Sequence, residues 1–125
     1  MPARYFTVDE ANSLIGEIEP LMNRLLDRRA KVVEARQDVA NLLGAQSSDI
    51  GGRAASELVQ DFIAIEQLAR KIRAYGCILK DLNVGLVDFL AQRDGREVYL
   101  CWRFGEPRVD FYHELHTGFR GRQHL

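Results

Sequence analysis

Asp94 and Gly95 lie between two runs that alternate like β-strands, in the segment LVDFLAQRDGREVYLCWRF (residues 86–104). An Asp-Gly pair in that setting is the strongest short-range signal of a two-residue hairpin turn. If these residues form the turn, Arg93 faces Arg96 and the register of the whole hairpin follows. One face then carries the apolar pairs Val87–Trp102, Phe89–Leu100 and Ala91–Val98. The other face carries the pairs Asp88–Cys101, Leu90–Tyr99 and Gln92–Glu97.

A second turn, GEPR, and a third alternating run, VDFYHEL, extend this hairpin. Pairing Phe104 with Val109 across the turn continues the apolar face over three strands and places His113 on it, beneath the helices. The pairs on the apolar face are then Trp102–Phe111, Leu100–His113 and Val98–Leu115. Those on the polar face are Arg103–Asp110, Cys101–Tyr112, Tyr99–Glu114 and Glu97–His116.

The first half of the chain has the periodicity of helices. The sequence TVDE fits a capping box, in which Thr7 caps the helix and Glu10 reaches back to a free N–H group. Apolar residues then recur at three- and four-residue steps to about residue 43, and Pro20 predicts a kink or a short helix followed by a long one. After the glycine-rich loop GAQSSDIGG, a second helix is predicted over about residues 53–75.

These elements predict an α+β fold, a long antiparallel two-helix hairpin followed by a small three-stranded antiparallel β-meander packed on it. We expect one domain, residues 1–125, divided into the helical hairpin (7–75), the meander (85–116) and a C-terminal tail (117–125). Two helices of this length cannot cover each other's apolar stripe. We therefore expect a homodimer that completes a four-helix bundle, or else another protein partner on the stripe.

Charge and hydropathy exclude several classes of protein. Lys and Arg number 17 and Asp and Glu 18, so the net charge of −1 argues against nucleic acid as a partner and against a polybasic attachment to membranes. No apolar run approaches the roughly 18 residues that span a bilayer, and the N-terminus lacks the apolar region of a signal peptide. With only two cysteines, Cys77 and Cys101, the simplest prediction is a reduced protein in the cytoplasm.

The three histidines all lie near the C-terminus, which raises the hypothesis of a metal site. Asp110, His113 and His116 are spaced three apart, but on a strand the two histidines point to opposite faces and could share an ion only across a bulge. A site on the polar face suits Zn²⁺ or another late divalent metal better. Its residues would be Asp88, Cys101, Asp110, Tyr112, Glu114 and His116. The alternative is an ordinary solvated face of an antiparallel sheet.

His113 and the C-terminal tail allow further alternatives. On the apolar face, His113 is either a buried neutral imidazole with a hydrogen-bond partner or a group that projects into a pocket. Arg29 and Arg36, in step with the first helix's seam, could then offer cations to an anionic ligand, or could extend to solvent. In TGFRGRQ, two glycines permit close backbone approach, so the tail either binds a small anion or docks through Phe119. The candidate anion-binding residues are Arg103, Arg120, Arg122 and Trp102.

Three segments of the chain resemble one family. They are YFTVDEAN, GCILKDLNVGLVDF and GREVYLCWRFGEPRVDFYHELHTGFRGRQ, and together they are similar to the DUF2203 family of small uncharacterised bacterial proteins. The resemblance implies no catalytic residues, and the sequence has no GxxxxGK[ST], GxGxxG, GxSxG or CxxC motif. Two hypotheses follow. The protein either binds a metal or small ligand through its sheet and tail, or it is a non-catalytic dimer that docks a protein partner.

Overall fold

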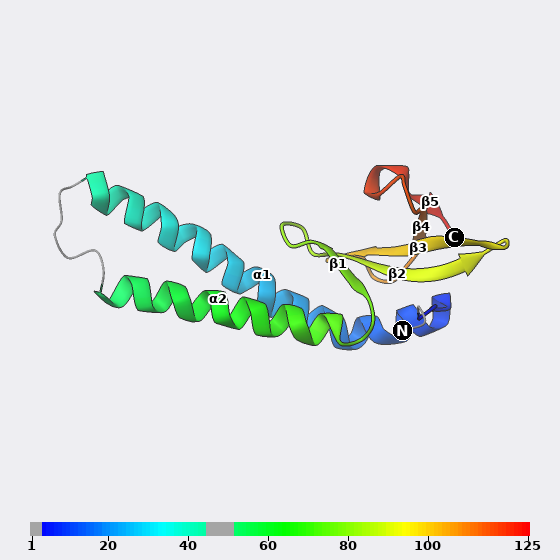
Figure 1. Ribbon diagram of the computed structural model, residues 1–125, viewed down its shortest axis with the longest axis horizontal. Coiled ribbons are helices and arrows are strands. Elements are labelled where there is room, and N and C mark those ends of the chain that lie inside the picture. Colours follow the sequence, from blue (N-terminus) through cyan, green and yellow to red (C-terminus); the bar gives the residue numbers. More distant parts are fainter. Residues whose placement is uncertain (1–3, 45–51) are drawn as a thin grey trace.

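The computed structural model describes residues 4–44 and 52–125, and two long helices form its first half (Figure 1). Helix α1 (Val8–Gly44) and helix α2 (Gly52–Arg73) run antiparallel and lie side by side. Residues 45–51 of the predicted loop lie outside the described part of the chain. Neither helix, over the residues described, is long and apolar enough to cross a membrane.

Helix α1 starts at the predicted capping box and continues through its proline. The N–H of Glu10 donates to Thr7 Oγ1 and the N–H of Thr7 donates to Glu10 Oε1, each at 3.1 Å. The helix is a single element with Pro20 inside it, so the predicted two-helix alternative is wrong. Ile18 and Met22, on either side of the proline, are both fully buried. Packing of the helix on both sides of Pro20 offsets the hydrogen bond that a proline removes.

The second half is an antiparallel sheet with the strand order β1-β2-β3-β4-β5. Its strands are β1 (Ile78–Asp81), β2 (Leu86–Arg93), β3 (Arg96–Arg103), β4 (Phe111–Glu114) and β5 (Gln123–His124). The α+β class is therefore confirmed, but the sheet has five strands and not three. The two additional strands have four and two residues, which is too short for an alternating pattern to be visible in the sequence.

The register of the central hairpin is as predicted. Every pair from Leu86–Arg103 to Arg93–Arg96 is present. Asp94 and Gly95 form the turn, both with positive φ (52° and 77°), as a type I′ hairpin turn requires. Val87, Phe89 and Trp102 are fully buried on the face that packs against the helices, in the main hydrophobic core.

The register between β3 and β4 differs from the prediction by one residue. Tyr99 pairs with His113 and Leu100 with Tyr112, so His113 lies on the face away from the helices and Tyr112 on the face toward them. The strands are joined by residues 104–110 and not by a four-residue turn. Within this connection the N–H of Val109 donates to Asn12 Oδ1 of α1 at 2.7 Å, and Val109 is buried in the core. Because Val109 is bound to α1, it does not pair with Phe104.

The sheet covers only part of the helical hairpin. Met22 and Leu26 of α1 reach the turn before β2, where a Cβ atom on Gly85 would lie 3.1 Å and 3.2 Å from their side chains. Beyond this level the two helices extend away from the sheet (Figure 1). Val33, Val59, Phe62 and Ile63 on the extended part are exposed.

Candidate functional site

Part of the C-terminal segment, residues 117–124, packs against the face of the sheet that points away from the helices. This segment forms a 3-10 turn (Phe119–Gly121) and strand β5, which pairs with β4 (Figure 1). The guanidinium of Arg122 lies 4.0 Å from the ring centre of Phe111 and 4.7 Å from that of Phe119. The tail therefore packs over Phe111 on this face, and the charge of Arg122 acts on Cys101.

Three buried side chains with metal-binding atoms meet on this face of the sheet. Asp88 of β2 pairs with Cys101 of β3. His113 of β4 pairs with Tyr99, which lies two residues before Cys101 and on the same face of β3, so His113 stands beside the first two side chains. One ligand atom from each of the three residues lies within 4.8 Å of the other two. Asp88 is 1% exposed, Cys101 0% and His113 2%, so water does not reach the cluster freely.

The hydrogen bonds of His113 determine where its proton lies. Its Nδ1 atom is 2.8 Å from the carbonyl oxygen of Glu114, which can only accept, so Nδ1 carries a hydrogen. The Nε2 atom is 3.1 Å from Oδ2 of Asp88. In the neutral ring Nε2 then carries a lone pair that faces the Asp88 carboxylate. The contact between Nε2 and Oδ2 therefore requires a proton between the two atoms or a cation beside them.

Asp88 and Cys101 are both held away from their ionised forms by their surroundings. Burial raises the pKa of the Asp88 carboxyl, and the nearby His113 opposes this increase only in part. Among the described residues, no donor reaches Oδ1 of Asp88. Burial, followed by the charge of Asp88, raises the pKa of the Cys101 thiol to about 12. A buried cation would reverse both effects, because it favours the carboxylate and the thiolate.

The donor set is one that late divalent metals use. Imidazole nitrogen, thiolate sulfur and carboxylate oxygen are the usual ligands of Zn²⁺. A zinc-bound histidine normally donates its second ring N–H to a carbonyl or carboxylate, which fixes the tautomer, and His113 has that partner in Glu114. The residues present therefore fit a metal ion, and its ligands would be His113, Cys101 and Asp88.

The remaining predicted metal ligands lie elsewhere. Glu114 accepts two hydrogen bonds from Arg96, at 2.5 Å and 3.0 Å, and these lower the pKa of its carboxyl. Asp110 is paired with Arg108 at 2.8 Å, and His116 is exposed. The structure therefore brings together Asp88 and Cys101 of the predicted polar face with His113, which was predicted on the opposite face. The predicted β3–β4 register differs from the observed one by one residue, and it had placed His113 on the opposite face from Asp88 and Cys101.

Three of the four predicted anion-binding residues make other contacts. Arg122 binds both carboxylate oxygens of Glu106, at 2.7 Å and 2.8 Å. The indole N–H of the buried Trp102 donates to the carbonyl oxygen of Glu106 at 3.1 Å. Arg103 lies 5.9 Å from the ring centre of Phe119, and Arg120 is exposed. Glu106 thus joins the β3–β4 connection to the tail.

The two helix arginines lie far from His113 in the fold. Arg29 donates a hydrogen bond to Asn83 in the β1–β2 turn, and Arg36 lies 5.6 Å from the ring centre of Phe62 on α2. Both are on the helical side of the sheet, whereas His113 is on the other side. The alternative in which the two arginines lie beside His113 is therefore wrong. It depended on the predicted register, which placed His113 on the helical side of the sheet.

Comparison with known proteins gives a family and no relative of known activity. Searches of curated proteins and of solved structures gave no match. Residues 4–125 match the family model described as "Uncharacterized conserved protein (DUF2203)". This range includes both helices, all five strands and the three clustered side chains. The chain belongs to the DUF2203 family.

Proposed function

We propose that this protein binds a divalent metal ion, with Zn²⁺ as the best fit, through His113, Cys101 and Asp88. The observation that carries the proposal is the arrangement of these three side chains. Their ligand atoms lie within 4.8 Å of one another, and all three residues are at least 98% buried. A buried carboxylate facing the lone pair of a neutral imidazole is costly unless a proton or a cation lies between them.

The ion would join the three central strands. Each ligand comes from a different strand, β2, β3 or β4, and Arg122 of the C-terminal segment lies near Cys101. Metal binding would replace the protons of Cys101 and Asp88, so affinity would rise with pH. The two free, buried cysteines are consistent with a reducing compartment, and we place this activity in the cytoplasm.

Elemental analysis of untagged protein purified without chelator tests the proposal directly. We expect near-stoichiometric zinc in the wild type and in His116→Ala, which removes an exposed imidazole. Zinc should be lost from His113→Gln and from Cys101→Ser. Wild-type protein that remains metal-free after incubation with excess Zn²⁺, Mn²⁺ or Fe²⁺ would overturn the proposal.

Cobalt substitution identifies the ligands independently of purification. A Co²⁺ ion bound by a cysteine gives a thiolate-to-metal absorption band in the near ultraviolet. We expect this band when the metal-free protein is titrated with Co²⁺, and its disappearance in Cys101→Ser but not in Cys77→Ser. Cobalt bound without the band would exclude Cys101 as a ligand and contradict the proposed site.

A second candidate function, as a structural homodimer, is supported by the exposed side chains of α2. Val59, Phe62 and Ile63 are 56%, 44% and 52% exposed and lie at helical spacing on the part of the hairpin that the sheet does not cover. A second copy presents the same stripe, so two hairpins related by a two-fold axis would cover each other as a four-helix bundle. A partner helix would compete for this surface.

Light scattering coupled to size-exclusion chromatography tests this candidate. One chain has a mass of 14.3 kDa. We expect twice this mass for the wild type and the mass of one chain for Ile63→Glu. Ile78→Glu introduces the same charge at another exposed isoleucine, on β1, and should leave the dimer intact. A wild-type monomer at high micromolar concentration would contradict the dimer.

A further inference from the structure

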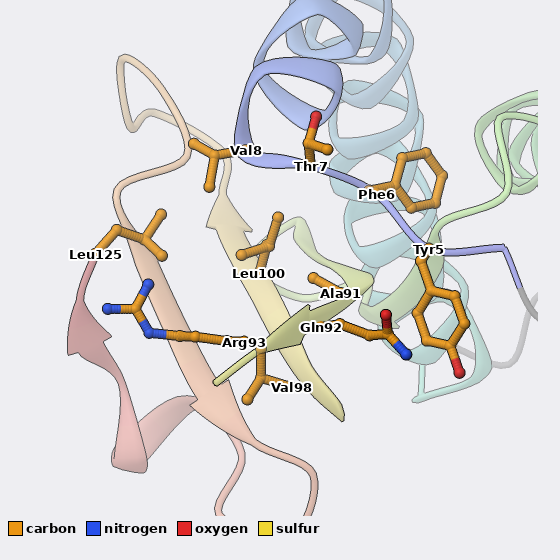
Figure 2. A pocket seen from close by; sticks show the side chains of 10 residues that line it. All are labelled: Tyr5, Phe6, Thr7, Val8, Ala91, Gln92, Arg93, Val98, Leu100 and Leu125. Carbon is orange, nitrogen blue, oxygen red and sulfur yellow. The ribbon is translucent and has the colours of Figure 1, made fainter. Parts of the chain in front are cut away.

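A cavity of about 380 Å³ lies on the helical side of the sheet, where the strands extend past the start of α1 (Figure 2). Its walls come from the segment before α1, from the ends of β2 and β3 next to their turn, and from the last residue. The proposed metal site is on the opposite face of the same sheet, because Ala91 and Val98 of the cavity point toward the helices and His113 points away. The cavity is therefore independent of the proposed metal site.

The floor and one side of the cavity are apolar. Val98 and Leu100 form part of the floor, and Val8 and Leu125 stand at its edge (Figure 2). Val8 is 37% exposed and Leu125 38%, although both are large aliphatic residues. An apolar chain placed between them would remove this surface from water, which is favourable in proportion to the area covered.

Arg93 supplies charge at the same opening. Of the described residues that line the cavity, it has the one charged side chain. Its guanidinium lies 4.4 Å from the ring centre of Tyr112, which holds it in place. No ion pair within residues 4–44 and 52–125 involves Arg93, whereas its neighbour Arg96 is paired with Glu114. A fixed guanidinium without a carboxylate partner, beside an apolar floor, is complementary to an amphipathic anion.

We propose that this cavity binds a monocarboxylic acid with an unbranched aliphatic chain. The carboxylate would accept hydrogen bonds from Arg93, and the chain would lie over Val98 and Leu100 between Val8 and Leu125. The other polar residues of the lining are Tyr5, Thr7 and Gln92. Tyr5 already donates to Glu97 Oε1 at 2.9 Å, so Arg93 is the main determinant of binding.

Titration of ¹⁵N-labelled protein with octanoate, followed by NMR, tests the proposal. We expect shifts of the amides of residues 5–8, 91–93 and 98–100, and little effect from octanol at the same concentration. Arg93→Met keeps an apolar side chain over Tyr112 and should weaken octanoate binding by about tenfold or more, the loss of one charge-assisted hydrogen bond. Arg73→Met, at an exposed site at the end of α2, should have no effect.

Three outcomes would overturn this proposal. Octanoate could leave these amides unchanged, octanol could bind equally well, or Arg93→Met could bind octanoate as tightly as the wild type. The comparison between octanoate and octanol uses wild-type protein, so it decides the role of charge even where the variant does not fold. Neither titration depends on metal, because Asp88, Cys101 and His113 lie on the other face of the sheet.

Discussion

The imidazole of His113 faces the carboxylate of Asp88 inside the protein, with Nε2 3.1 Å from Oδ2. The two residues are 25 positions apart in the sequence and are brought together by the pairing of β2, β3 and β4. Because the other ring nitrogen donates to Glu114, this contact contains either a shared proton or a cation. The stability of the protein depends on which of these is present.

In the metal-free protein, removal of the imidazole should be strongly destabilising. His113→Ala leaves the Asp88 carboxyl buried without its partner and a cavity in place of the ring, and we expect a loss of about 2–5 kcal/mol. Urea denaturation in the presence of chelator, at neutral pH, measures the change in the free energy of unfolding. A loss below about 1 kcal/mol would mean that Asp88 is solvated in solution.

A double variant distinguishes the interaction between Asp88 and His113 from the effect of the cavity that His113→Ala leaves. Asp88→Asn in the His113→Ala background removes the unpaired acid, so it should restore part of the lost stability. In the wild type the asparagine amide can donate to the lone pair of Nε2 in place of the acid proton, so the same Asp88→Asn change should not raise stability there. Equal effects of Asp88→Asn in both backgrounds would show that the two side chains do not interact.

Alkaline pH should destabilise the metal-free protein through its cysteines. The pKa of Cys101 is raised from 9.0 to about 12 and that of Cys77 to about 11, in both cases mainly by burial. Above pH 9 the unfolded chain loses thiol protons that the folded chain retains, so the free energy of unfolding falls as pH rises. The slope from each thiol approaches about 1.4 kcal/mol per pH unit.

Comparison of variants assigns this pH dependence. The free energy of unfolding is measured in urea between pH 8 and pH 11 for the wild type, Cys101→Ala and Cys77→Ala. Each variant should show a shallower decrease than the wild type, whatever its stability at pH 8. The three proteins differ only in the substituted cysteine, so parallel curves would exclude a contribution from the thiols.

The ion pair between Arg122 and Glu106 should hold the tail in place near Cys101. Arg122→Met leaves a mostly buried Glu106 carboxylate unpaired, and we expect a loss of about 2 kcal/mol. Arg108→Met, which breaks the more exposed pair with Asp110, should cost less than about 1 kcal/mol. Urea denaturation provides both values.

The same variant should expose Cys101. In a Cys77→Ser background, the reaction of the remaining thiol with a disulfide reagent under native conditions reports opening of the tail. We expect Arg122→Met to accelerate this reaction and Arg108→Met to leave it unchanged. If Arg122→Met reacts at the rate of its parent, the tail does not control access to the cluster.

The sequence is sufficient for the local part of this fold. The capping box of Thr7 and Glu10 and the hairpin around Asp94 and Gly95 depend on residues close together in the chain, and both were predicted correctly. That register alone places Asp88 opposite Cys101, which is two thirds of the candidate site. The signal came from turn chemistry and from strict alternation of apolar residues.

The third ligand could not be predicted because its position depends on a distant contact. The run VDFYHEL has apolar or aromatic residues on both faces, so alternation does not distinguish the two registers. The hydrogen bond from Val109 to Asn12 joins residues 97 positions apart and removes Val109 from the ladder. With Val109 outside the ladder, the β3–β4 register places His113 on the same face as Asp88, and the local sequence contains no signal of that contact.

Two glycines with opposite surroundings offer a final test of the tail. A Cβ atom on Gly121 would lie 2.4 Å from the Cβ of Thr117, so the close approach that the sequence suggested is made by the tail to itself. A Cβ on Gly16, within α1, would have nothing within 4 Å. Gly121→Ala should therefore destabilise the protein by about 1–3 kcal/mol, through a clash that the tight turn cannot relieve.

Gly16→Ala is the matched substitution and should have the opposite sign. Alanine in a helix interior is favoured over glycine by about 0.5–1 kcal/mol, because the unfolded glycine has more conformational freedom to lose. Thermal unfolding of both variants against the wild type gives the two signs. Stabilisation by Gly121→Ala would mean that residues 117–121 do not adopt this turn in solution, and the packing of the tail over Phe111 would then be looser than the structure has it.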